Sequence, residues 1–462
     1  MRVKAIPSAL AAAALLAVAG CGGHDSAGDS SDGDATPTKA AQQTTSVDFG
    51  DLKKVCGPGD AKSAPAQGVT AKTIDVGVFS DVGFTKNPEF GDTAKVFTSW
   101  CNAAGGINGR KLVATVRDSK LMEVRQRMLE ACKQDFALVG GGAALDALGV
   151  QDRLRCLLPD FPAQVSQIQN QGSDLQLNAT GGASYDRYAG YYQWLVKTAY
   201  PKSASSVGTI AGDAAVSKVI DAREQESLKA TGAKITYHDL YPAAGVSDWT
   251  PYAQAIKSKG VKGLIFLGDF ASLSKLEQVL TGMNYKLDWI DANNNAYGPA
   301  FLQLAGKSLD HQNNFADLSG VYPLEQAAGN PATEQLVQLF KKYAPNAQPT
   351  LPGVRGFASW LLFAKAASSC GDALTRTCLY EAARKETAWT GGGLIAPVDL
   401  SQADAPLRCF NIEKATSKGW QPADFKPNDG AYSCNAPTYK FKGTYGKPLT
   451  LADVGKSLSD VK

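Results

Sequence analysis

The sequence predicts an α/β protein with two Rossmann-like lobes, each built around a parallel sheet. Two observations support this fold class. Strands and helices alternate along most of the 462 residues, and the alternation comes in two successive series. Strands separated by helical segments indicate βαβ units and therefore parallel pairing. The chain is also long enough for two or three domains.

The first series contains three predicted strands. A buried strand is expected at 73–79, followed by a helix at 93–103 that two glycines end at 105–106. A strand at 112–117, a helix at 123–133 and a strand at 136–139 complete the series. The aromatic-rich stretch 185–199 is predicted as a helix that ends before Pro201.

The second series begins at a strand predicted for 206–211. Strands follow at 234–241, 263–267 and from 289, with helices at 216–230, 250–259 and 273–280 between them. Further helices are expected near 333–343 and 357–369. Because open α/β sheets bind ligands beyond the carboxyl ends of their strands, two facing lobes would form a single cleft. The pattern thus favours a clamshell receptor for a small molecule.

The first twenty residues have the pattern of an export signal. Arg2 and Lys4 precede an apolar run at 5–18 that is too short for a membrane span. The run ends in Val-Ala-Gly-Cys, which resembles the bacterial lipobox and implies cleavage after Gly20 and a diacylglycerol on Cys21. The alternative is an ordinary signal peptide with an incidental cysteine. The resemblance predicts an extracytoplasmic protein, lipid-anchored to the outer face of the cell membrane.

A tether is expected at 21–47, since this segment is rich in small and polar residues and contains no aromatic residue before Val47. The formal net charge of +3 falls to +1 when Arg2 and Lys4 are removed. No basic stripe suggests a nucleic-acid partner, and no segment after Cys21 has the length and apolarity of a membrane span. We expect a monomer.

Eight cysteines remain after Cys21, an even number in an exported chain. Their spacing permits many connectivities. We favour pairing of sequence neighbours, which gives Cys56–Cys101, Cys132–Cys156, Cys370–Cys378 and Cys409–Cys434. A metal site is the alternative, but the sequence has no C-x-x-C pair and no histidine near these cysteines, so neither metal nor cofactor is expected.

Three segments resemble the type I periplasmic binding proteins, in particular the leucine/isoleucine/valine-binding branch of ABC-transporter receptors. They are residues 68–81 (GVTAKTIDVGVFSD), 102–112 (NAAGGINGRKL) and 248–257 (DWTPYAQAIK). The middle segment is fairly specific, although its glycines and its Asn-Gly turn indicate a structural role and not a binding role. The resemblance covers residues 68–434.

This resemblance implies a clamshell whose lobes are joined by a multi-strand hinge. The expected first lobe comprises 68–184 and 321–395, the second lobe 185–320 and 396–436, and a C-terminal extension follows at 437–462. Carried over position by position, the implied ligand contacts are Ser80, Asp81, Phe90, Ala143, Ala144, Gln164, Ser166, Asp213, Asp269, Phe270, Asn294 and Tyr322.

Two of these positions depart from the amino-acid receptors. Ala144 stands where the family offers a serine to the ligand carboxylate, and asparagines at 293–295 stand where it keeps an acid for the ammonium. Since an unpaired buried charge is costly, we hypothesise a polar neutral, amide-like or aromatic ligand. The alternative is that Asp269 or Asp291 supplies the acid and a backbone amide replaces the serine.

Catalysis has little support in the sequence. It lacks an H-E-x-x-H motif, a G-x-S-x-G elbow and a phosphate-binding G-x-x-x-x-G-K-[ST] loop. We therefore expect a binding protein that is not an enzyme. It would capture a small polar or amino-acid-like solute by hinge closure and deliver it to an ABC permease. The alternative is a ligand-sensing lipoprotein that signals to a membrane partner.

Overall fold

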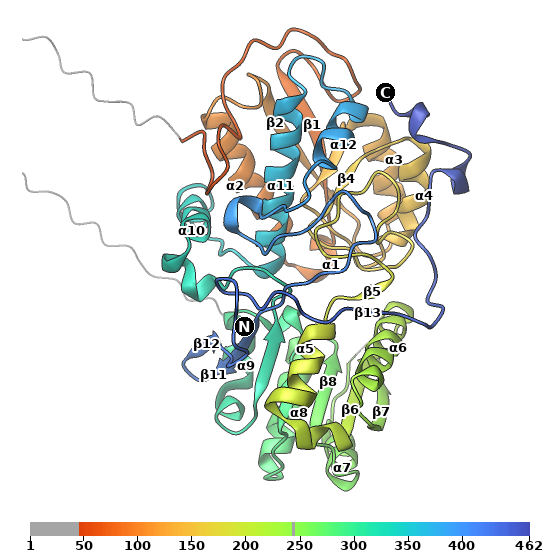
Figure 1. The fold of residues 1–462 in the computed structure, drawn as a ribbon, viewed down its shortest axis with the longest axis vertical. Coiled ribbons are helices and arrows are strands. Elements are labelled where there is room, and N and C mark those ends of the chain that lie inside the picture. The colour runs from red at the N-terminus through yellow and green to blue at the C-terminus, as the bar shows by residue number, and fades with distance from the viewer. Residues whose placement is uncertain (1–45, 243–244) are drawn as a thin grey trace, which may run out of the picture. The chain divides into compact units, whose positions relative to one another are not determined.

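The computed structural model describes residues 46–242 and 245–462 (Figure 1). Its first sheet has the order β2-β1-β3-β4, and every pair of neighbouring strands is parallel. These strands are β1 (Thr73–Ser80), β2 (Lys111–Asp118), β3 (Ala137–Val139) and β4 (Asp160–Phe161). The three strands predicted for the first series are thus present, and the short strand β4 is added at one edge.

Helices cover both faces of the first sheet. On one face, α2 (Glu89–Ala103) packs against α11 (Leu351–Ser369), and Phe97 stacks on Trp360 with 5.3 Å between ring centroids. On the other face, α3 (Val124–Gln134) packs against α4 (Ala147–Arg155). The helices α10 (Pro331–Tyr343) and α12 (Arg376–Ala383) pack beside α2 and α11, respectively. A two-sided covering explains why the parallel strands are apolar along most of their length.

The second sheet has seven strands in the order β12-β11-β10-β9-β8-β6-β7. Five are parallel: β6 (Val207–Gly212), β7 (Ile235–Tyr241), β8 (Gly263–Leu267), β9 (Trp289–Asp291) and β10 (Asn314–Asp317). Two antiparallel strands, β11 (Ile412–Thr416) and β12 (Gly419–Pro422), extend the edge next to β10. The sequence pattern does not predict these last two strands because they belong to no βαβ unit.

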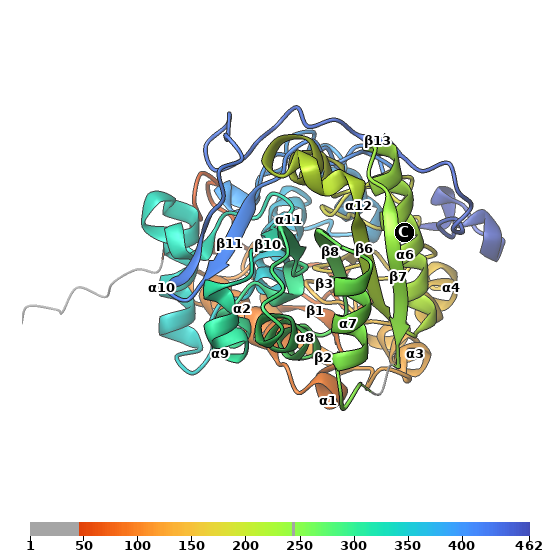
Figure 2. The same cartoon turned by 90° about the horizontal axis from the view of Figure 1, so that it is seen from below.

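Neighbouring residues of a strand in the second sheet enter opposite layers of the core. Leu264 packs with Trp249 and with residues of α7 (Thr250–Ser258) and α8 (Phe270–Gly282), whereas Ile265 packs with Tyr191 and Trp194. This alternation follows from the two-residue period of a strand. Figure 2 shows β6, β7 and β8 side by side, with α6 (Ala215–Ala230) and α7 near them.

The predicted helix at 185–199 is wrong at its beginning. Residues Tyr185–Asp186 form the short strand β5, then come α5 (Ala189–Gln193) and a π-helical segment at Trp194–Ala199. Strand β5 pairs antiparallel with β13 (Tyr439–Lys440), which lies about 250 residues later in the chain. A partner so distant in sequence cannot be inferred from local periodicity.

The chain passes several times between the two sheets. It enters the second lobe at β5, returns between β10 and α10, and enters it again before β11. These passages are linked to each other, because Leu318 N donates to Asn411 O at 2.9 Å and Val321 pairs with Ile395. The C-terminal residues add a further passage, since Leu451 N donates to Asp174 Oδ2 at 2.7 Å and Arg376 N to Lys462 O at 3.0 Å.

The first lobe also includes residues that precede its predicted start at 68. Phe49 is fully buried and packs 5.0 Å from the ring of Phe357 and 5.8 Å from that of Trp100. Ser46, which the composition assigns to the tether, accepts a hydrogen bond at its carbonyl from Trp100 Nε1. The aromatic side chain of Phe49 explains why the folded part begins this early.

The structure contains four disulfides, and they are the pairs of sequence neighbours. Cys56–Cys101 attaches the N-terminal segment to α2, Cys132–Cys156 joins α3 to α4, and Cys370–Cys378 joins α11 to α12. The fourth, Cys409–Cys434, closes a loop that includes β11 and β12. Among the described residues, no group of three His, Cys, Asp or Glu could hold a metal ion. Cys21 lies outside the described residues.

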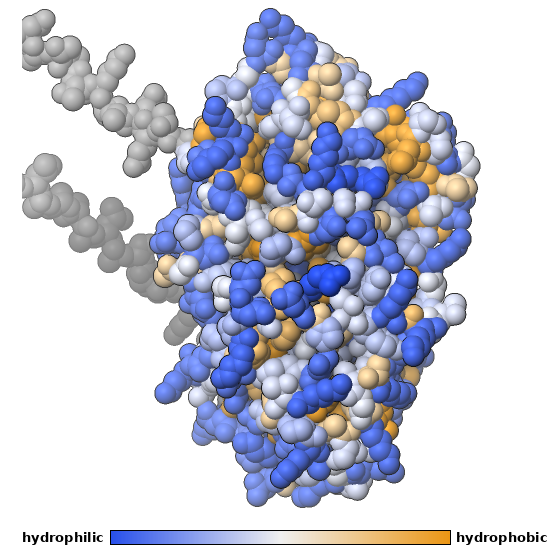
Figure 3. Space-filling model, viewed as in Figure 1, coloured by the Kyte–Doolittle hydropathy of each residue, from blue (hydrophilic) through white to orange (hydrophobic). Residues whose placement is uncertain are grey.

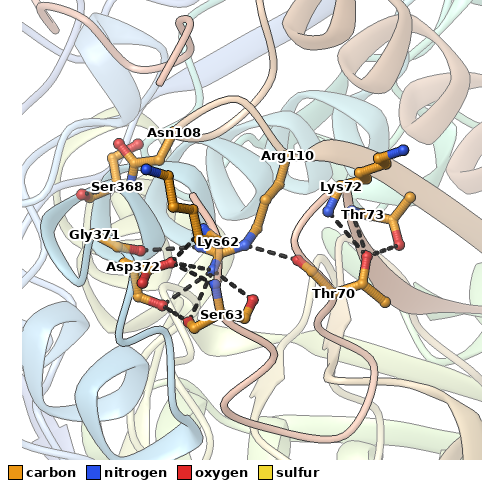
Figure 4. A network of polar contacts seen from close by, with 10 residues as sticks. All are labelled: Lys62, Ser63, Thr70, Lys72, Thr73, Asn108, Arg110, Ser368, Gly371 and Asp372. Carbon is orange, nitrogen blue, oxygen red and sulfur yellow. Dashed lines mark hydrogen bonds and ion pairs between the residues drawn. The ribbon is translucent and has the colours of Figure 1, made fainter. Parts of the chain in front are cut away.

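The segment 102–112 has the structural role that its sequence indicates. Gly105, Gly106 and Gly109 have φ values of +113°, +82° and +84°, and the Asn102 amide is hydrogen-bonded to Leu112 N and O. The fully buried Arg110 donates hydrogen bonds to four carbonyl groups and to the Asp372 carboxylate (Figure 4). These contacts join three segments of the first lobe, and none belongs to a ligand site.

No helix in the described part of the chain is both long and apolar enough to cross a membrane. Hydrophilic residues cover most of the face shown in Figure 3, interrupted by smaller hydrophobic areas.

Candidate ligand-binding site

A cavity of about 290 Å³ lies between residues of the two lobes. The first lobe contributes the loop after β4, with Gln164 and Ser166, and the first turns of α11, with Pro352 and Arg355. The second lobe contributes β5, one side of α6 and the loops that follow β8 and β9. Phe441, from the C-terminal segment, completes the lining. The cavity therefore lies where the carboxyl ends of parallel strands are expected to bind a ligand.

Two backbone features shape the second-lobe wall. Gly268 follows β8, and a Cβ atom at this position would lie 1.8 Å from the hydroxyl of Tyr241. Asn293 follows β9 with a φ of 62°, and its side chain accepts a hydrogen bond from Asn295 N at 3.3 Å. A larger residue at the first position would have to displace the ring of Tyr241, and asparagine is one of the residues that tolerate the second.

Three arginines contribute positive charge to the cavity: Arg187, Arg223 and Arg355. Arg223 donates to Ala183 O at 2.8 Å, and Arg355 donates to Leu318 O at 3.3 Å. Burial lowers the pKa of both guanidinium groups to about 10, so both stay charged at neutral pH. Within the described residues, no carboxylate oxygen lies within 4.0 Å of a nitrogen of these three side chains.

Two acids, Asp186 and Glu224, also line the cavity, and both are buried. Glu224 is 4% exposed, and its Oε2 has no hydrogen-bond partner among the described residues. Burial, together with the nearby Asp291 and Asp186, raises the pKa of Glu224 well above its ordinary value and favours the neutral acid. Asp186 accepts hydrogen bonds from the Ser227 hydroxyl and from Tyr188 N.

On the second-lobe side of the cavity, the side chains of Tyr188 and Asn294 are hydrogen-bonded to each other. Asn294 Nδ2 donates to the Tyr188 hydroxyl at 3.0 Å, and burial raises the pKa of Tyr188 to about 12. The hydroxyl therefore stays protonated and is free to donate in turn. The two side chains form a hydrogen-bonded pair in a lining that also includes the apolar residues Ile220 and Leu267.

The structure brings three of the sequence-predicted contacts together at the cavity: Gln164, Ser166 and Asn294. Asp81 lies elsewhere and accepts hydrogen bonds from Ser119, Leu121 N and Ala144 N, so it organises loops of the first lobe. The Ser80 hydroxyl accepts from Val82 N at 3.2 Å.

The remaining predicted contacts also lie outside the lining of the cavity. Phe90 is a buried residue of the first core, and Ala143 lines a separate internal space of about 30 Å³. Asp213 pairs with Lys218 at 2.5 Å on the exposed side of α6. Asp269 caps α8 by accepting from Ser272 N at 2.8 Å, and Phe270 is the first residue of that helix.

Tyr322 lies near Tyr432, with 6.4 Å between ring centroids. The acid proposed as an alternative ammonium acceptor, Asp291, is engaged as well. It accepts from Tyr191 at 3.2 Å and from Asn293 N at 3.0 Å, and it does not line the cavity.

Sequence reasoning missed the charged residues of the cavity. Arg223 and Glu224 belong to a charged stretch of α6 that has the composition of a solvated helix face. Among the charged residues of the cavity, only Arg355 has a sequence context that could have identified it. Arg355 is one of only two charged residues in the otherwise apolar helix α11, and a cation in such a helix indicates a buried polar site.

A two-lobed α/β fold with a cavity between its lobes defines a class of ligand-binding receptors. The family model described as "Periplasmic binding protein" matches residues 77–419, and the chain belongs to this family. The predicted family and fold class are thereby confirmed. No curated protein sequence matches this chain.

Solved structures show the same fold at low sequence identity. A fatty acid ABC transporter substrate-binding protein from Thermomonospora curvata has a TM-score of 0.64 at 19% identity, covering 84% of this chain and 97% of its own. A leucine-binding protein from Thermotoga maritima has a TM-score of 0.60 at 14% identity, covering 76% and 97%. A branched-chain amino acid transporter substrate-binding protein from Streptococcus pneumoniae, in complex with isoleucine, has a TM-score of 0.62 at 16% identity, covering 76% and 98%.

Proposed function

We propose that this protein is the extracytoplasmic substrate-binding receptor of an ABC importer. The observation that carries the proposal is the cavity of about 290 Å³, whose lining comes from both lobes and includes charged, aromatic and apolar side chains. Concave sites with a few convergent polar groups are typical of small-molecule binding. The names of similar solved structures, which include receptors for fatty acids and for branched-chain amino acids, support the same role.

Capture would proceed by hinge closure. A ligand held by residues of one lobe would favour the arrangement in which the other lobe also contacts it. The passages near Leu318, Ile395 and Asn411 supply the hinge, because they connect the lobes and are hydrogen-bonded to each other. The closed form would present the surface that the permease binds.

The place of action follows from the N-terminal pattern. A diacylglycerol on Cys21 would hold the protein at the outer face of the membrane, and the residues up to 45 would serve as the spacer. Each receptor would carry its own lipid anchor and would not need a second copy of the chain. We therefore propose a monomer that meets its permease in the plane of the membrane.

The proposal can be tested by a thermal-shift screen of the secreted protein carrying Cys21→Ser against a metabolite library. A ligand raises the apparent melting temperature by mass action. We expect at least one compound to raise it, and we expect Tyr188→Ala to abolish that rise while leaving the melting temperature of the ligand-free protein within a few degrees. A shift that persists in Tyr188→Ala and Asn294→Ala would place binding elsewhere and contradict the proposal.

A further inference from the structure

The lining of the cavity includes three arginines and two acids, so positive charge is in excess. The guanidinium groups of Arg187, Arg223 and Arg355 all line it, and no carboxylate of the described residues lies within 4.0 Å of them. Their hydrogen-bonding capacity is also largely unused. Arg355 makes one hydrogen bond, at 3.3 Å, and the buried Nε of Arg223 makes none. A guanidinium has five N–H donors.

The acids of the cavity do not compensate for this charge. Burial disfavours the ionised form of Glu224 and raises its pKa, and the nearby Asp291 and Asp186 add to this effect. The carboxylate of Asp186 is occupied by Ser227 and by the backbone of Tyr188. Removing unpaired cations from water is costly unless an anion joins them.

The rest of the lining combines amide and hydroxyl side chains, among them Gln164, Gln171 and Asn294, with apolar and aromatic ones. Ile220, Leu267, Pro352 and Phe441 form the apolar part, and Tyr188 also belongs to the lining. Such a lining suits an organic body of similar size, and the planar donor fork of arginine matches a carboxylate in a bidentate manner.

We infer that the ligand is an organic acid whose carboxylate binds Arg355 together with Arg187 or Arg223, and whose apolar or aromatic body packs against Ile220, Leu267 and Phe441. This inference rests on the proposed receptor function and names the chemical class of its substrate. It replaces the neutral solute that the sequence suggested, because the three arginines come from positions that the sequence interpretation did not include.

The same geometry disfavours a zwitterionic amino acid. An α-ammonium group is held best by an ionised acid. The two acids of the lining are Glu224, whose burial favours the neutral acid, and Asp186, whose oxygens already accept hydrogen bonds. A monocarboxylate has no second charge to pair. It therefore fits the available groups better than leucine or isoleucine does.

Calorimetric titration of the secreted Cys21→Ser protein with matched pairs of an acid and its amide tests the inference. The probes are benzoate and benzamide, hexanoate and hexanamide, with leucine as the zwitterion. We expect at least one acid to bind at least tenfold more tightly than its amide and than leucine. We expect Arg355→Gln to weaken that binding roughly tenfold or more, as the loss of a charge-assisted contact does.

The control is Arg125→Gln, which removes an exposed arginine paired with Asp152 and should leave the affinity unchanged. Arg187→Gln repeats the test if Arg355→Gln does not fold. Equal affinity for an acid and its amide, no binding of either acid, or binding that neither arginine variant weakens, would overturn the inference. If a neutral metabolite raises the melting temperature and Tyr188→Ala abolishes that rise, the receptor function stands and only the ligand class fails.

Discussion

The guanidinium of Arg223 lies over the ring of Phe441, with 4.3 Å between Cζ and the ring centroid. Arg223 belongs to α6, and Phe441 follows β13 near the end of the chain. Both line the cavity. The contact places the C-terminal segment beside the candidate ligand site, although the sequence treats that segment as an extension outside the two lobes.

Phe441→Ala should weaken ligand binding without unfolding the protein. The change removes a ring from the cavity lining and the cation–π contact that orients Arg223, a contact worth about 0.5–2 kcal/mol. We expect roughly a threefold to thirtyfold loss of affinity for any ligand that the thermal-shift screen identifies. Phe84→Ala is the matched control, because Phe84 is 62% exposed and lies on α1 (Val82–Thr85), outside the cavity. Equal affinity of Phe441→Ala and the parent protein would contradict the role given to this ring.

Glu226 holds the same segment on α6. Its carboxylate accepts hydrogen bonds from the hydroxyls of Tyr439 and Tyr445 and from the backbone of Lys442 and Gly443. These contacts outweigh burial and lower the pKa of Glu226 to about 2. A lowered pKa stabilises the fold above the ordinary value near 4.5, and that stability is lost as the pH falls toward 2.

Glu226→Gln should therefore lower the melting temperature at pH 7 and have a smaller effect near pH 2. It should also increase hydrogen exchange of the amides at 439–445, which the carboxylate fixes in the parent protein. Glu334→Gln serves as a control on another helix, since Glu334 is exposed on α10 and makes no side-chain hydrogen bond among the described residues. Unchanged exchange at 439–445 would show that other contacts hold the segment.

Much of the fold could be predicted because its signals are local. The βαβ series follows from apolar strands and helix stops such as Gly105 and Gly106, and neighbouring cysteines pair as their order suggests. The antiparallel strands β11 and β12 and the β5–β13 pair could not be predicted in this way. The β10–β11 and β5–β13 pairs join residues far apart in the chain, and β12 follows β11 in a short hairpin outside any βαβ unit.

The site was predicted less completely than the fold. Of the predicted contacts, Gln164, Ser166 and Asn294 line the cavity, because a loop that follows a strand has a fixed place in this architecture. Arg223 and Glu224 were missed because a helix of charged residues normally faces solvent, and only the packing of both lobes and of Phe441 shows that this side of α6 faces inward. Asp81 has the residue type of a ligand contact, but it makes hydrogen bonds within its own lobe.

Arg110→Met should destabilise the protein strongly. The side chain is fully buried and donates to the carbonyls of Ser63, Thr70, Gly371 and Asp372 at 2.9–3.1 Å (Figure 4). Methionine fills a similar length but leaves these acceptors without a donor, which costs on the order of 3 kcal/mol in the free energy of unfolding. Denaturant titration measures this loss.

The control for this variant is Arg125→Met, which removes an exposed arginine. Its partner Asp152 is buried but keeps its ion pair with Arg155, so the change should cost less than about 1 kcal/mol. Ligand affinity should stay unchanged in both variants as long as they are folded, because neither residue lines the cavity. A loss for Arg110→Met no larger than that of Arg125→Met would show that water replaces the guanidinium at the four carbonyls.

The stability of the fold should decrease as the pH rises from about 4 to about 7. Burial raises the pKa of Asp146, Asp291 and Asp317 to about 7 each. In this range the unfolded chain releases these protons and the folded protein keeps them, so the folded state binds more protons and its relative stability falls as the pH rises. Each such group contributes at most about 1.4 kcal/mol per pH unit.

Asp291→Asn isolates one of these contributions. Asparagine keeps an oxygen that can accept from Asn293 N and from Tyr191, and it has no proton to lose. The free energy of unfolding of the variant, measured in denaturant at several pH values, should therefore fall less steeply between pH 4 and pH 7 than that of the parent protein. Asp60→Asn, at an exposed ion pair with Lys62, should leave the slope unchanged. Equal slopes for Asp291→Asn and the parent protein would show that the pKa of Asp291 is not raised in the folded state.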